Sequence, residues 1–579
     1  MTFYSIINYP SYLDLIEFVL IALILYVAKF YLDYFTRPNK FPGPIPLPVL
    51  GTLLWYNGNP AEWVTKAQEK YGDIFELYMG KERVIWLSNS DLITKIVSPS
   101  TNNNFLIRIT PNQGLDEIGF TTKGITFNRN VESWKYNRKF FNQAIKSPKF
   151  LKQTVEKIQK IFPEIEICWS KLSKFDQNIQ NSKNSNIKLS DINLSEWIPQ
   201  FIMDLTFLAM TNKRTYSFAN YYYNTMIGNK KEKDEGEEEY FGQFKDPVVI
   251  KEIKKVENFA KIIHEWSCAI QFFMSTPKLW RDYIPSYKRK ANNLKKSINK
   301  ANEVYLKLIK DRKQEIDRIP IDEQLDADTL TMFLTVNTPR DITTRADNNH
   351  TRPMSEEEIL GNIFEIISGG VDTTSSGFCF IIYHVEHHPK VKGRMLKEID
   401  SVFGKDPNRK IAFDDLNKLI YCEAIIKEVL RVMSIVPIIF RTSLRDDKIS
   451  GHQFSGQTQF MLNTYGIHHN KEHWINPEVF NPSRFLGKEE EVSDNDNENG
   501  KNNQKSGIHK NSFIAFGGGP RMCPGKQLAM TTIKTIMVLL YRKYDVRLSD
   551  MNAPIKYHFS LLRNCDDLNV ILKPIFQDL

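Results

Sequence analysis

The sequence predicts a mainly α-helical protein with small β-sheets, an α+β fold that is preceded by one membrane-spanning helix. Three observations lead to this prediction: an apolar segment near the N-terminus, helical spacing of apolar residues over most of the chain, and a few short strand-like stretches. The 579 residues are 41% apolar and 25% charged, which is typical of a folded protein with a large core.

The charge and the cysteines exclude several classes of protein. The 77 basic and 68 acidic residues give a net charge of +9, but this excess is spread along the chain, so it does not indicate nucleic-acid binding. The six cysteines are far apart and form no C-x-x-C pair. A structural zinc site, a redox dithiol or a disulfide scaffold is therefore not expected.

The N-terminal segment has the length and composition of a transmembrane helix. Phe18–Ala28 is an unbroken apolar run, and the wider stretch Tyr12–Tyr34 would span roughly 34 Å as a helix. A cleaved signal peptide would need a basic start, and no Lys or Arg precedes Lys29; a buried core helix is the other alternative. We expect residues 1–35 to be a single-pass membrane anchor.

Basic residues follow the apolar span at Lys29, Arg37 and Lys40, which places the remaining chain on the cytosolic side. Residues 36–48 contain the alternating prolines of Pro42–Pro48, which favour a stiff extended linker. We expect residues 49–579 to form one catalytic domain.

Within this domain, Ile74–Met79 and Arg83–Leu87 predict a β-hairpin, and further strand-like pieces lie at Ile438–Leu444 and Leu568–Leu572. Three polar tracts have too little apolar content to fold and are predicted to be surface insertions: 176–186, 229–239 and 487–511. The sequence has neither a P-loop nor a G-x-G-x-x-G dinucleotide motif. Electrons for any redox reaction must therefore come from another protein.

A glycine-rich segment near the C-terminus carries a cysteine. It reads F-G-G-G-P-R-M-C-P-G from Phe516 to Gly525, and a helical pattern of apolar residues follows at once. The glycines permit a tight loop in which backbone amides approach the sulfur of Cys523, and the positive end of the next helix favours a thiolate. Such a thiolate suits a soft metal ion. A buried structural cysteine is the alternative, but the pattern F-x-x-G-x-R-x-C-x-G should occur by chance in only about one sequence of this length in ten thousand.

These ten residues resemble the haem-binding loop of the cytochrome P-450 family. The resemblance implies that Cys523 is the axial thiolate ligand of haem b, and that Phe516, Gly519 and Gly525 shape the haem-binding loop. Other motifs of the family follow one another in the expected order from about Phe41 to the C-terminus. The departures are a diluted proline hinge and a longer polar stretch before the cysteine loop.

A long helix is predicted upstream of this loop. Ser355 and Glu358 form a capping box, and apolar periodicity continues to His388 before Pro389. Its middle reads G-G-V-D-T-T from Gly369, where the hydroxyl of Thr373 can bond to the carbonyl of Gly369. Close helix packing is the alternative use of these small residues. The hexad is similar to the family's oxygen-activation motif, which implies that Asp372 and Thr373 deliver protons.

Charged residues elsewhere match two further family features. Glu428 and Arg431 lie one helical turn apart, and the resemblance implies that Arg484 joins them in a structural network that holds the cysteine loop. Four residues match positions that bind the haem propionates: Trp134, Arg138, Arg441 and Arg521. Each of the arginines, taken alone, could be an ordinary surface residue.

The resemblance implies a monooxygenase that inserts one atom of O₂ into a lipophilic substrate. Electrons would come from NADPH through a separate membrane-bound cytochrome P-450 reductase, and the protein would lie in the endoplasmic reticulum with its catalytic domain in the cytosol. By analogy, the substrate cavity would be lined by Ser368, Ile435, Val436 and Ile439. Glu365 lies just over two helical turns before Thr373 and is a candidate contact for a polar or cationic group of the substrate; a neutral acid, or one that faces a neighbouring helix, is the alternative.

Three alternatives remain open at this stage. A haem-thiolate isomerase or dehydratase of lipid peroxides would not need the Asp372–Thr373 proton route. A non-catalytic haem-binding protein or sensor would lack turnover, and a membrane-tethered interaction protein would be colourless.

Overall fold

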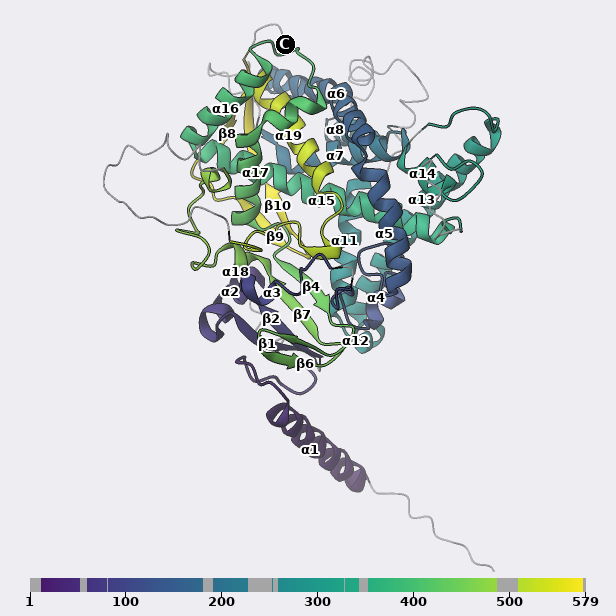
Figure 1. Ribbon diagram of the computed structural model, residues 1–579, viewed down its shortest axis with the longest axis vertical. Coiled ribbons are helices and arrows are strands. Elements are labelled where there is room, and N and C mark those ends of the chain that lie inside the picture. The colour runs from purple at the N-terminus through teal and green to yellow at the C-terminus, as the bar shows by residue number, and fades with distance from the viewer. Residues whose placement is uncertain are drawn as a thin grey trace, which may run out of the picture.

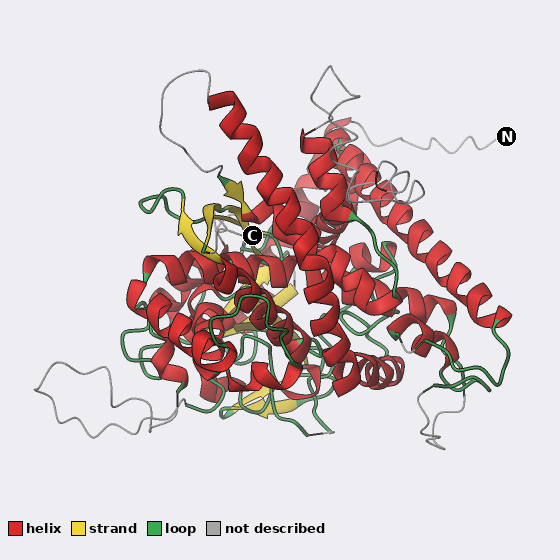
Figure 2. Ribbon diagram, turned by 90° about the horizontal axis from the view of Figure 1, so that it is seen from above, coloured by secondary structure: helices red, strands yellow, loops and turns green. Residues whose placement is uncertain are grey.

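A computed structural model describes residues 12–52, 60–80, 82–100, 102–180, 191–226, 253, 259–326, 328–342, 352–486 and 509–575. Helices make up most of these residues, and the strands form four small sheets (Figure 2). This confirms the predicted fold class. Of the predicted polar insertions, 229–239 lies outside the described residues.

The N-terminal helix α1 (Tyr12–Thr36) projects from one end of the domain (Figure 1). It is long and apolar enough to cross a bilayer, and no residue of its most apolar window is buried against the protein. At its end, the ring of Tyr34 packs against Tyr78, and Arg37 pairs with the buried carboxylate of Glu76. The base of the helix is therefore fixed to the domain.

The largest sheet has the strand order β1-β2-β7-β4. The predicted hairpin is confirmed as β1 (Ile74–Met79) and β2 (Glu82–Leu87), with Ile74 opposite Leu87. β7 (Gln459–Asn463) runs parallel to β2 and pairs antiparallel with β4 (Ile438–Thr442). This sheet brings residues near position 440 beside the N-terminal part of the domain.

The other sheets have two or three strands each. β11 (Asn569–Pro574) includes most of the predicted strand and pairs with β8 (Tyr544–Leu548) and β3 (Ile192–Asn193). The remaining strands form two hairpins: β5 (Asp447–Ile449) with β6 (His452–Phe454), and β9 (Lys556–Phe559) with β10 (Arg563–Asp567).

The helix α15 (Glu356–His387) runs through the centre of the domain. Its capping box is confirmed, because the Ser355 hydroxyl accepts the amide of Glu358 and the Glu358 carboxylate accepts the amide of Ser355. α15 packs against α7 (Leu194–Thr211), α11 (Phe259–Ser275) and α13 (Pro285–Arg318). Apolar side chains of these helices share one continuous core.

The other helices surround this centre. They are α2 (Pro60–Tyr71), α3 (Ser90–Ile93), α4 (Gln113–Glu117), α5 (Val131–Lys146), α6 (Pro148–Gln180), α8 (Ser217–Met226), α12 (Lys278–Tyr283), α14 (Thr329–Thr335), α16 (Pro389–Phe403), α17 (Ile420–Met433), α18 (Thr464–His468) and α19 (Lys526–Lys543), with short 3₁₀ turns at Phe413–Lys418, Pro482–Phe485 and Gly519–Arg521.

Two predicted insertions need correction at their ends. The tract 176–186 was expected to lie outside regular structure, but α6 continues to Gln180, because an established helix gains one hydrogen bond for each added residue; residues 181–186 lie outside the described residues. At the other tract, 487–508 lies outside the described residues, whereas His509 is ordered by a hydrogen bond to Ser90 (2.8 Å).

Candidate active site

The cysteine loop folds back tightly on itself. The amide of Cys523 donates to the carbonyl of Phe516 (2.8 Å), so the loop begins and ends side by side. Gly519 has a φ of 64°, and a Cβ there would lie 2.7 Å from the backbone oxygen of Ser98. Only glycine fits at this position, because any side chain would meet the backbone after α3.

The thiol of Cys523 lies at the end of this loop, just before the N-terminus of α19. Burial raises the pKa of the thiol and outweighs the opposing effects of the Gly525 amide and of Arg138 and Arg108, which favour the thiolate. The Gly525 amide at the start of α19 thus favours the thiolate, as the sequence indicated, but burial has the larger effect. A metal ion that coordinates the sulfur removes its proton directly.

The middle of α15 borders an open space. Gly369 is exposed although it lies in the middle of the central helix, next to buried Ser368, and a Cβ at Gly369 would meet no atom within 4 Å. Cys523 is half-buried on its loop. The space beside Gly369 is therefore a hollow that α15 borders.

The predicted oxygen-side residues line α15 at this hollow. The hydroxyl of Thr373 donates to the carbonyl of Gly369 (2.6 Å), as predicted. The neighbouring Asp372 accepts a hydrogen bond from the hydroxyl of Ser267 on α11 (3.1 Å). Ser267 could not be found from the sequence, because it lies in a different helix 105 residues away and belongs to no motif.

Four guanidinium groups are buried close to Cys523. Three of them, Arg138, Arg441 and Arg521, were predicted, and the fourth is Arg108. Burial lowers the pKa of Arg441 to about 9 and that of Arg138 to about 10, and mutual repulsion adds to the effect. Sequence analysis missed Arg108 because it is an isolated arginine in an irregular segment.

The arginines differ in how they are already engaged. Arg521 donates to the backbone oxygens of Leu106 (2.5 Å), Ile125 (2.6 Å) and Asn128 (3.2 Å), and its guanidinium lies 4.1 Å from the centre of the Trp134 ring. It therefore joins the cysteine loop to the segment that carries Arg108. By contrast, the Nε of Arg108 and the indole Nε1 of Trp134 are buried without a hydrogen-bond partner among the described residues.

These features fit a haem group. The carboxylate of Glu365 acts on Arg108, Arg138 and Arg521, but four cations and the unpaired donors favour a further anionic group, and the two propionates of haem would supply that charge. No group of three or more His, Cys, Asp or Glu side chains in the described part of the chain could hold a metal ion. A metal ion on Cys523 would therefore need its other ligands from a cofactor, as a porphyrin provides.

The structure also brings the three residues of the predicted network together. Arg431 forms a two-point ion pair with Glu428, with both nitrogen–oxygen distances at 2.8 Å and both side chains fully buried. Arg484 lies 3.3 Å from the same carboxylate and donates to the carbonyls of Ile475 and Asn476. Breaking a buried pair of this kind leaves an uncompensated charge.

His468 connects this network to the cysteine loop. Arg431 donates to the backbone oxygen of His468 (2.9 Å), and the imidazole of His468 accepts the amide of Ile514 (3.0 Å), just ahead of Phe516. Burial lowers the pKa of His468 well below its ordinary value, so the ring is neutral and can accept this bond. The sequence offered no motif that would have identified His468.

The predicted substrate residues lie on two segments. Ser368 and Ile435 are buried, Val436 is half-buried, and the side chain of Ile439 approaches Gly517 of the cysteine loop. Glu365 is held by the protein itself: its carboxylate accepts the amides of Ile125 (2.5 Å) and Thr126 (2.9 Å). These bonds join α15 to the loop that precedes α5.

The titration of Glu365 gives a test of this contact. Burial raises its pKa from 4.5 to about 7, so the folded protein retains a proton that the unfolded chain has released. The stabilisation is complete below about pH 4.5 and is lost as the pH rises through about 7. The melting temperature of the wild type should therefore fall relative to that of Glu365→Gln as the pH rises from about 5 to about 8.

Thermal unfolding of both proteins over this range measures the effect, and Glu303→Gln, at an exposed acid of α13, serves as the control. Parallel melting curves for wild type and Glu365→Gln would contradict the assignment.

Comparisons with known proteins agree with this geometry. The family profile described as Cytochrome P450 matches residues 41–570. Similar proteins include Cytochrome P450 3A6 of Oryctolagus cuniculus (24% identical; 89% of this chain and 87% of the relative covered) and Cytochrome P450 3A14 of Cavia porcellus (25%; 93% and 92%). Steroid 17-alpha-hydroxylase/17,20 lyase of Felis catus is 25% identical, with 92% of each chain covered. The chain therefore belongs to the cytochrome P-450 family, whose members are haem-containing monooxygenases.

Proposed function

We propose that the protein is a membrane-bound monooxygenase that inserts one oxygen atom of O₂ into a lipophilic substrate, with Cys523 as the thiolate ligand of haem b. The observation that supports this most directly is the position of Cys523, on a tight loop within the electrostatic range of Arg108 and Arg138. NADPH supplies electrons through a separate reductase, since the sequence has no nucleotide-binding motif of its own.

The protein holds the cofactor from two sides. Arg108, Arg138, Arg441 and Trp134 provide cations and an indole N–H for the propionates, while Arg521 braces the loop that carries Cys523. A haem with a thiolate ligand supplies the cleavage of the O–O bond of O₂, because the sulfur donates electron density to the iron.

The chain's own part in the reaction is to supply protons and exclude water. Thr373 already donates its hydrogen to Gly369, so its oxygen can accept a hydrogen bond from a group in the hollow. Asp372 is the neighbouring acid that can take protons from outside and pass them on. The hydrophobic side chains of Ile435, Val436 and Ile439 favour a lipophilic substrate.

Steroids are the first substrate class to test, because one relative is named as a steroid hydroxylase. Glu365 is a second candidate for substrate contact through a polar or cationic group. Its existing bonds to Ile125 and Thr126 indicate that its main role is to join α15 to the neighbouring loop.

The membrane supports both anchoring and substrate supply. α1 has the length and composition of an anchor, and the basic residues that follow it favour a cytosolic position of the domain; the endoplasmic reticulum is the membrane that we propose. α12 lies at the same end of the domain (Figure 1) and carries strongly exposed Leu279 (69%) and Tyr283 (78%). We expect this end to rest on the bilayer, the source of lipophilic substrates.

Replacement of the ligand tests the haem assignment. Cys523→Ser should lose the absorption band that thiolate-ligated haem gives after reduction and exposure to carbon monoxide, because a hydroxyl does not replace the thiolate. Cys422→Ser, at a buried cysteine of α17, is the control and should keep the band. A wild-type spectrum typical of histidine-ligated haem would overturn the proposal.

Thr373→Ala tests proton delivery. Removal of the hydroxyl should lower the yield of oxidised substrate per NADPH by up to about a hundredfold, while peroxide release rises. A hundredfold effect is at the low end of what general acid catalysis contributes. The assay is reconstituted turnover with any steroid, fatty acid or terpene that shifts the haem spectrum on binding. Ser375→Ala is the control, because the hydroxyl of Ser375 bonds within α15 to the carbonyl of Val371. Equal yields in the wild type and both variants would remove Thr373 from the mechanism.

The contributions of α1 and α12 to membrane binding can be measured separately. Without residues 1–35, the protein should still bind phospholipid vesicles weakly, and adding Leu279→Ser and Tyr283→Ser should abolish this binding in flotation assays. Ile321→Ser, at an equally exposed apolar residue beyond α13, should have no effect. Unchanged vesicle binding of the double variant would show that α12 does not touch the bilayer.

A further inference from the structure

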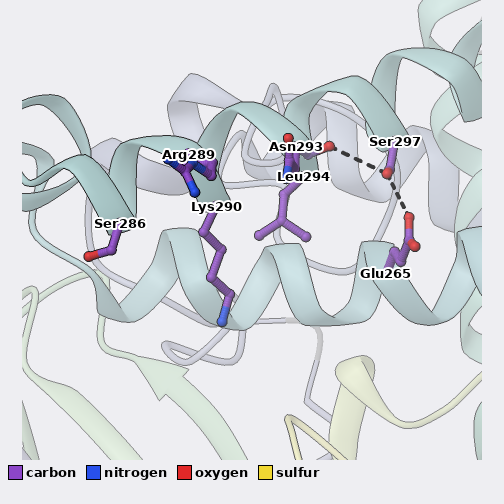
Figure 3. Close-up of a pocket in the computed structure, with 7 residues that line it drawn as sticks. All are labelled: Glu265, Ser286, Arg289, Lys290, Asn293, Leu294 and Ser297. Atoms are coloured by element: carbon purple, nitrogen blue, oxygen red, sulfur yellow. Dashed lines mark hydrogen bonds between the residues drawn. The ribbon is translucent and has the colours of Figure 1, made fainter.

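The helix α11 is fixed by side-chain hydrogen bonds on two sides. Toward α13, the hydroxyl of Ser297 donates to the carboxylate of Glu265 (2.6 Å), across a polar hollow between the two helices (Figure 3). Toward α15, the hydroxyl of Ser267 donates to Asp372 (3.1 Å). Glu265 and Ser267 are two residues apart, so one turn of α11 is tied to both neighbours.

An aromatic cluster makes the same turn rigid. The ring of Trp266 lies 4.0 Å from Phe364 of α15 and 4.6 Å from Phe120, measured between ring centres. Phe364 also contacts Tyr305 of α13 edge-on. Buried aromatic packing of this kind allows little displacement, so the backbone on either side of Trp266, including Ser267, is held at a defined distance from α15.

The contact with Asp372 is a charge-assisted hydrogen bond in a buried setting. Only 6% of Ser267 is exposed, and a hydroxyl that donates to a carboxylate is worth more there than in water. Asp372 and Thr373 are adjacent in α15, so their side chains point about 100° apart around the helix. Asp372 can serve the site next to Thr373 only if its carboxylate is kept in one orientation.

We propose that Ser267 is a positioning residue for proton delivery: its hydroxyl holds the carboxylate of Asp372 in the orientation that supplies the Thr373 site. This inference rests on the proposed monooxygenase function. Ser267 itself touches neither the cofactor nor the substrate in this role, and it acts through Asp372 alone. The helix that contributes it is held by the contacts of Trp266 and Glu265, so the hydroxyl is kept at a defined distance from the carboxylate of Asp372.

The inference is tested with three variants of the full-length haem-loaded protein. Ser267→Ala removes the donor, Ser267→Thr keeps a hydroxyl, and Ser275→Ala is the matched control, because the exposed Ser275 bonds only to the carbonyl of Gln271 in its own helix as the structure describes it. Each protein is reduced with NADPH and reductase without added substrate. O₂ that takes up two electrons and two protons appears as hydrogen peroxide, and O₂ that takes up four of each appears as water.

Ser267→Ala should raise the ratio of peroxide to water about tenfold, the low end of the effect of a hydrogen bond to a charged group. It should also enlarge the solvent deuterium isotope effect on water formation. Ser267→Thr should restore both values, and Ser275→Ala should match the wild type. In addition, the infrared C–O stretching band of the carbon monoxide complex should broaden in Ser267→Ala, because Asp372 loses one of the bonds that orient its carboxylate.

The outcomes separate this inference from the proposed function. If the wild type shows the thiolate–haem spectrum and Thr373→Ala raises peroxide release, but Ser267→Ala equals the wild type in both the ratio and the infrared band, the positioning role is wrong and the function stands. If Ser267→Thr behaves like Ser267→Ala, the hydroxyl is not the cause and the inference is likewise overturned. A wild type without the thiolate–haem spectrum rejects the function itself.

Discussion

Positive charge buried around one thiol is the constraint on which the rest of the structure depends. Arg108, Arg138, Arg441 and Arg521 lie within electrostatic range of one another, and burial lowers the pKa of each. Water cannot compensate these charges, and within the described residues Glu365 is the carboxylate that opposes them. A dianionic cofactor, as the family implies, would therefore complete the charge balance of the protein interior in addition to providing its chemistry.

The architecture around the thiol serves to hold a loop that has little structure of its own. The Glu428–Arg431 pair is fully buried, and Arg431 donates to the backbone oxygen of His468. The neutral imidazole of His468 in turn accepts a hydrogen bond from the amide of Ile514. On the other side, Arg521 binds three backbone oxygens of the segment 106–128. The cysteine is thus positioned by contacts that originate far outside its own motif.

Features set by local sequence could be predicted, and those set by distant contacts could not. The capping box of α15, the hairpin of β1 and β2, the bond from Thr373 to Gly369 and the pairing of Glu428 with Arg431 each involve residues close in sequence, where periodicity and spacing are informative. Arg108, Ser267 and His468 belong to the site only because separate elements meet there. The effect of burial on the pKa of the Cys523 thiol could not be predicted for the same reason, since burial is a property of the whole fold and not of the helix that follows the cysteine.

The bond from Arg521 to Leu106 joins residues 415 positions apart, and this separation has a consequence for biosynthesis. The segment around Leu106 is synthesised long before Arg521. The bond between them, and with it this part of the site, can form only when almost the whole polypeptide has emerged from the ribosome. With Cys523 as the proposed ligand, haem can be bound only after this late segment has emerged. A chain that ends before Cys523 would lack the sulfur ligand altogether.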